Sequence, residues 1–207
     1  MAKTALDVYF DKMVLRTSLE VFGDLTNYIS SVQKAIENES QKVISTADKL
    51  KGKGYSEEQI ADILDEDAYY SNTFAKNAYS MAVVLVYSQI ESLLNTGMLA
   101  IGKIWKKHIK FNSLLNQYSK CGIELKQIDY FAVVNEIRLV NNVIKHNNLK
   151  CNVELSANNS FGWKAGDRIE VTEKTVCFYV DEAEKYFKEL QIQINSVIDK
   201  QITEEEV

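Results

Sequence analysis

The absence of proline from all 207 residues constrains the fold of this chain more than any other feature of its sequence. Average usage of about 5% would place roughly ten prolines in a chain of this length. Proline interrupts helices because its ring removes a backbone donor and clashes with the preceding turn. Since there are also only eight glycines, the sequence predicts long, uninterrupted helices and an all-α fold.

The composition is that of one globular domain. Hydrophobic residues make up 46% and charged residues 26% of the chain, which is enough apolar material to bury a core without metal or disulfide links. The net charge of −5 excludes a uniformly basic protein that coats nucleic acid. We therefore expect a single domain over residues 1–207.

Nothing in the sequence predicts a membrane span, a metal site or a cofactor. The longest apolar run, residues 81–86, is far shorter than the roughly 20 residues that cross a bilayer, and the charged N-terminus does not resemble a signal peptide. The three cysteines are widely spaced and form no CxxC pair. We expect a cytoplasmic protein without metal or cofactor.

Local signals divide the chain into helices. Gly52 and Gly54 end an N-terminal helical extension over residues 1–54. Ser56 and Gln59 have the spacing of a capping box and open an antiparallel helical bundle over residues 56–207. Within it, the apolar pattern from Tyr69 to about Lys107 predicts a central helix that is buried on more than one side.

A small β-hairpin is expected near residues 168–180, before the last helix. Apolar side chains alternate there at a period of two, which is typical of short strands. Asp181 with Glu184 is the expected start of the helix that follows. The predicted architecture is therefore an all-α bundle with one hairpin.

Two segments carry local excesses of charge. Residues 56–68 hold six acids and no base, which favours either a solvated helix face or a docking surface for a basic partner. Residues 101–127 hold six lysines against Glu124 alone. This basic segment either keeps the chain soluble or binds a phosphate backbone, and the candidate RNA-binding residues in it are Lys103, Lys106, Lys107 and Lys110.

One helix gathers the residues best suited to chemistry. Arg138, Asn142 and His146 follow one another at intervals of four, so they lie along one face, with Lys145 beside them. Together they offer a general acid or base, cations for phosphate and amide donors. The alternative is that the asparagines cap the helix end and the cations complement its dipole.

The run from Glu136 to Asn148, EIRLVNNVIKHNN, resembles the E-h-R-x-h-R-N-x-h-x-H-N-N signature of HEPN domains, where h is an apolar residue. The wider resemblance covers roughly residues 69–200. It implies a helical-bundle protein of a toxin–antitoxin or anti-phage system, with an antitoxin or another defence protein as partner. It also implies a metal-independent endoribonuclease that forms a homodimer, with both copies of His146 near a shared cleft.

Within that resemblance the catalytic histidine is His146 and the polar residue is Asn142, but Asn141 stands where the family has arginine. Asparagine cannot neutralise a scissile phosphate as guanidinium does. Arg138 or Lys145 could replace the missing cation, although loss of cleavage is the simpler inference. Three hypotheses stay open: an RNA-cleaving enzyme, a non-catalytic module that binds RNA or protein or dimerises, and an unrelated helical structural protein.

Overall fold

The computed structural model describes residues 5–102 and 109–203, and helices hold 80% of them. The order of elements is α1 (Ala5–Ser18), α2 (Val21–Gly52), α3 (Glu57–Ala100), α4 (Phe111–Lys120), the 3₁₀ turn η1 (Leu125–Gln127), α5 (Phe131–His146), α6 (Val153–Ala157) and α7 (Glu173–Thr203). The described ranges contain no strand, and their one isolated β-bridge joins Lys150 to Arg168. The predicted all-α class is confirmed.

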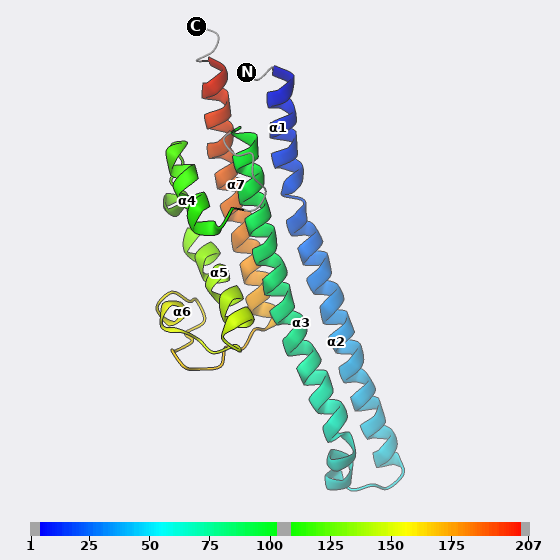
Figure 1. The fold of residues 1–207 in the computed structure, drawn as a ribbon. Coiled ribbons are helices and arrows are strands. Elements are labelled where there is room, and N and C mark those ends of the chain that lie inside the picture. Colours follow the sequence, from blue (N-terminus) through cyan, green and yellow to red (C-terminus); the bar gives the residue numbers. More distant parts are fainter. Residues whose placement is uncertain (1–4, 103–108, 204–207) are drawn as a thin grey trace.

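Helix α3 is the longest element, with 44 residues, and α1, α2, α4, α5 and α7 all pack against it. It merges the two helical segments predicted on either side of Tyr69. Its N-terminus has the predicted capping box, in which the Gln59 amide donates to Ser56 Oγ at 3.3 Å and the Ser56 amide donates to Gln59 Oε1 at 2.9 Å. Figure 1 shows α2 and α3 side by side and antiparallel, joined by a short turn.

The core lies around the C-terminal half of α3. Val83, Val86, Ile90 and Leu94 of α3 are fully buried, and the apolar faces of α5 and α7 complete the same cluster. Helices α1 and α2, predicted as an extension, contribute to that cluster through Leu15, Phe22, Leu25 and Ile29. Among the described residues, no helix has both the length and the apolar composition of a bilayer span.

The predicted hairpin near residues 168–180 is wrong, because α7 already begins at Glu173. Thr172 and Thr175 cap this start reciprocally, each amide donating to the other's hydroxyl, at 3.3 and 3.4 Å. Val176, Tyr179, Val180 and Ala183 are all buried, which is the 3.6-residue period of a helix. The helix therefore starts at Glu173 and not at Asp181, where the sequence predicted its start.

The far ends of α2 and α3 project beyond the other helices (Figure 1). We define residues 30–81 as the two-helix arm, whose base packs against the core at Tyr79. Leu64 is the one buried side chain in the arm. Several large apolar side chains on it are exposed instead, among them Ile44, Ile63, Tyr70 and Phe74. The arm thus contains two well-formed helices with almost no core between them.

Candidate functional site

Helix α5 carries the residues that the sequence singled out. It begins after Tyr130, which adopts a left-handed conformation with φ +68°, and ends at His146. Its apolar face, which includes Val134, Ile137 and Val140, packs against α3 and α7. The polar side chains of α5 differ in their exposure to solvent.

Asn141, at the position where HEPN domains carry arginine, lies inside the protein. Its side chain is 2% exposed, and its Oδ1 atom is buried without a hydrogen-bond partner among the described residues. A buried amide oxygen without a donor is unfavourable. An arginine at this place would have to bury its guanidinium in the core, which costs far more.

Arg138 is engaged in contacts within the chain. Its Nε donates to Asn135 Oδ1 and its Nη2 to Glu154 Oε1, both at 3.0 Å. Its guanidinium also lies over the Phe111 ring, 5.7 Å from the centroid. Arg138 therefore links α5 to α4 and α6, and its charge already has a carboxylate partner.

Lys145 and His146 are the candidate residues on the surface. Both are exposed in the last turn of α5, and neither makes an ion pair or hydrogen bond with the described part of the chain. Asn142 lies on the same helix and is half-buried. Eight residues separate His146 from Arg138, about 12 Å along the helix axis, so the structure does not bring the guanidinium and the imidazole together.

The asparagines after His146 shape the end of the helix. The amides of Asn147 and Leu149 both donate to the Val143 carbonyl, at 3.1 and 3.2 Å. Asn148 and Leu149 turn the chain through left-handed conformations with φ +47° and +61°, and the Asn147 side-chain amide donates to the Lys150 carbonyl. The two bonds to the Val143 carbonyl satisfy a group that a helix end leaves free. Both come from backbone amides, whereas the Asn147 side chain bonds a carbonyl beyond the helix.

The structure describes only one of the four predicted RNA-binding lysines. Lys103, Lys106 and Lys107 lie outside the described residues. Lys110 is exposed immediately before α4. The described chain contains no group of three or more His, Cys, Asp or Glu side chains placed to hold a metal ion.

A buried polar contact of α5 belongs to Glu136, which the sequence did not single out as a site residue. Its carboxylate is 2% exposed and accepts hydrogen bonds from the Ser160 amide at 3.0 Å, the Ser160 hydroxyl at 2.7 Å and the Tyr179 hydroxyl at 2.7 Å. Burial, together with the Glu136 charge, raises the pKa of Tyr179. The signal was in the sequence, since Glu136 falls on a helix face that is otherwise apolar.

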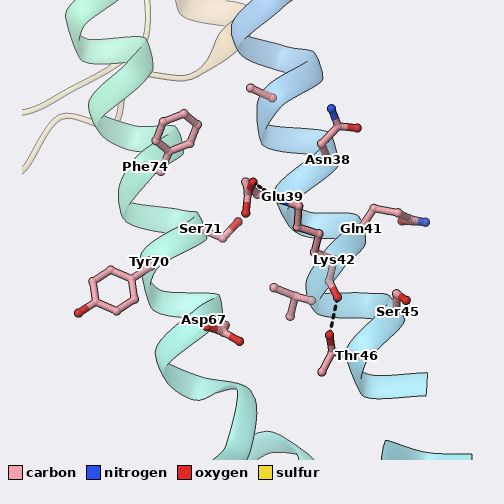
Figure 2. Close-up of a pocket in the computed structure, with 12 residues that line it drawn as sticks. Asn38, Glu39, Gln41, Lys42, Ser45, Thr46, Asp67, Tyr70, Ser71 and Phe74 are labelled. Atoms are coloured by element: carbon pink, nitrogen blue, oxygen red, sulfur yellow. Dashed lines mark hydrogen bonds and ion pairs between the residues drawn. The ribbon is translucent and has the colours of Figure 1, made fainter. Parts of the chain in front are cut away.

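A groove among the described residues lies away from α5, in the arm. It has a volume of about 1000 Å³ and runs between α2 and α3. Figure 2 shows Asp67 and Ser71 on the side of α3 that faces α2, whereas the Tyr70 ring points away from α2. The groove is lined by polar side chains of both helices, such as Lys42 and Asp67, and by apolar ones, such as Val43 and Phe74.

Comparison with protein-family models, with curated proteins and with solved structures gives no match. The HEPN resemblance therefore rests on residues 136–148 and on the helical context around them.

Proposed function

We propose that this chain is a HEPN-like helical bundle that acts as a non-catalytic association module. The proposal rests on the surroundings of the two positions that would supply the catalytic cation. Position 141 is buried in the core as asparagine, and Arg138 is held by Glu154 and Phe111. A module that works by binding needs neither position free.

The projecting arm supports the association part of the proposal. Globular proteins bury most large apolar side chains, and exposed groups of them mark interaction sites. Ile63, Tyr69, Tyr70 and Phe74 are each at least 47% exposed within a stretch of twelve residues on α3. The adjacent acids of residues 56–68 would keep such a surface soluble and select among partners.

The alternative function is a metal-independent endoribonuclease of a toxin–antitoxin or anti-phage system. The exposure of Lys145 and His146, both without partners in the described chain, favours it. In that case a homodimer would bring two copies of His146 to one cleft, and an antitoxin or another defence protein would control it. For either function we propose a cytoplasmic setting, and RNA would be the ligand of the exposed lysines.

Incubation with mixed RNA in excess chelator separates the two functions. The non-catalytic proposal predicts no cleavage by the wild type above that of His146→Ala. Chelator-resistant cleavage that is lost in His146→Ala, with products ending in 2′,3′-cyclic phosphate, would overturn the proposal in favour of the endoribonuclease. Since His146 is exposed, its truncation should leave the fold intact, and circular dichroism of both proteins checks this.

A further inference from the structure

Four large apolar side chains form an exposed stripe along the arm part of α3. Ile63 is 50% exposed, Tyr70 60%, Phe74 47% and Met81 54%. They follow one another at spacings of seven, four and seven residues, which place them at the a and d positions of one heptad frame. This is the pattern of a helix that packs against another helix.

The stripe is distinct from the seam that α3 already uses. Leu64, the buried residue of the arm, is one residue beyond Ile63 and hence about 100° around the helix. The side of α3 that faces α2 carries Ser71, while the Tyr70 ring points away from α2 (Figure 2). The stripe therefore lies beside the α2 seam, and Tyr70 and Phe74 also line the groove between the two helices. All four stripe side chains are at least 47% exposed, so no described element covers the stripe.

The spacing of the apolar residues in the stripe is the same when it is read from either end. Two copies of α3, aligned antiparallel about residue 72, place Ile63 opposite the partner's Met81 and Tyr70 opposite the partner's Phe74. Each apolar residue of the stripe thus meets an apolar residue of the partner's stripe.

Charge favours the same alignment. Lys76 and Arg168 line a second groove, of about 380 Å³, beside Asn77 and Ser80. Neither cation has an ion-pair partner among the described residues. In the antiparallel register, the acidic start of the partner's α3, which includes the partner's Asp62 and Glu66, runs along this side of the helix. The acids of one copy would meet the free cations of the other.

We infer that the stripe is a dimerisation surface whose occupant is the same stripe of a second copy, paired antiparallel about residue 72. Such a two-fold contact needs only one self-complementary patch. This inference rests on the proposed association function and names its partner. It differs from the dimer implied by the HEPN resemblance, because the contact lies on the arm of α3 and not on α5.

Sedimentation equilibrium tests whether the stripe dimerises. Wild type should shift from 23.6 kDa towards twice that mass as its concentration rises. Ile63→Glu should raise the dissociation constant about a hundredfold, because it places two charges in the contact. Ile192→Glu, the same change at a 62% exposed position on α7, should leave it unchanged. A wild type that stays at 23.6 kDa, or equal effects of the two variants, would overturn the inference.

Cysteine cross-linking tests the register. Ile63 and Met81 are 18 positions apart on one helix, about 27 Å, too far for a disulfide within one chain. The double variant Ile63→Cys/Met81→Cys should form a covalent dimer on oxidation, beyond any dimer that the native cysteines give in wild type. Neither single variant should do so. Cross-linking of a single variant would show parallel pairing, and an unlinked double variant would place the contact elsewhere; both results overturn the inference.

These experiments are independent of the test for cleavage. A monomeric wild type would remove the self-pairing, whereas RNA cleavage in chelator would remove the non-catalytic function. Circular dichroism of each variant should match wild type, because every substituted position is exposed.

Discussion

At the scale of single residues, the polar side chains of α5 divide into structural and free groups. Glu136 and Arg138 hold the helix to its neighbours, through Ser160 and Tyr179 in the first case and through Glu154 and Phe111 in the second. Lys145 and His146 have no partner in the described chain. The residues that resemble a catalytic signature thus include two that stabilise the fold.

Removal of the Glu136 carboxylate should be costly. Glu136→Ala leaves the Ser160 amide and the Tyr179 hydroxyl without their acceptor, so we expect the free energy of unfolding to fall by about 3 kcal/mol. His146→Ala, at an exposed position of the same helix, should change it by less than about 0.5 kcal/mol. Urea denaturation measures both, and similar values for the two variants would contradict the structural role of Glu136.

Buried tyrosines should make the protein sensitive to alkali. Burial raises the pKa values of Tyr118, Tyr179 and Tyr186. A group whose pKa is higher in the folded state contributes stability that is present below its unfolded pKa, about 10 for tyrosine, and is lost as the pH rises above it. We therefore expect the free energy of unfolding to fall above about pH 10, and the loss to be smaller in Tyr179→Phe than in wild type. An equal loss in Tyr179→Phe would exclude Tyr179 as a contributor.

At the scale of helices, close packing of α3 against α4 and α7 depends on Gly97. A Cβ atom at this position would collide with the Tyr118 hydroxyl and lie 2.6 Å from Ile194 Cδ1. The Tyr118 hydroxyl is fixed in turn by its hydrogen bond to the Leu94 carbonyl at 2.8 Å. Gly97 is therefore a packing residue that lets three helices approach closely.

Gly97→Ala should destabilise the protein although alanine favours helix. The clash should cost about 1–3 kcal/mol, more than the gain of about 1 kcal/mol in helix propensity. Gly23→Ala in α2 is the matched control, because nothing lies within 4 Å of its Cβ position, and it should stabilise by up to about 1 kcal/mol. Thermal unfolding compares the two, and a stabilised Gly97→Ala would contradict the packing.

How far the sequence predicts this fold depends on the range of the signal. The proline count, the capping box at Ser56 and the end of α2 at Gly52 are local signals, and the structure confirms the helices that they predict. The start of α7 was wrong because residues 176–180 fit a two-residue and a helical period equally well until the burial of Tyr179 is known. The burial of Asn141 and the Arg138–Glu154 pair depend on tertiary packing, which spacing along one helix does not reveal.

At the scale of the whole molecule, the helices make an elongated particle with an exposed arm. The 44 residues of α3 alone span about 66 Å, whereas a compact chain of 207 residues has a radius of gyration of about 17 Å. The core surrounds the C-terminal half of α3, and the arm reaches beyond it (Figure 1). In the proposed function, the core end supplies folding stability and the arm supplies the surface for association.

Small-angle X-ray scattering over a concentration series tests this division most directly. At the lowest concentration we predict a maximum dimension above about 66 Å and a radius of gyration well above about 17 Å. As the concentration rises, the mass from forward scattering should double in wild type and stay constant in Ile63→Glu. A radius of gyration near 17 Å would show that the arm folds back onto the core, and would contradict a projecting surface for association.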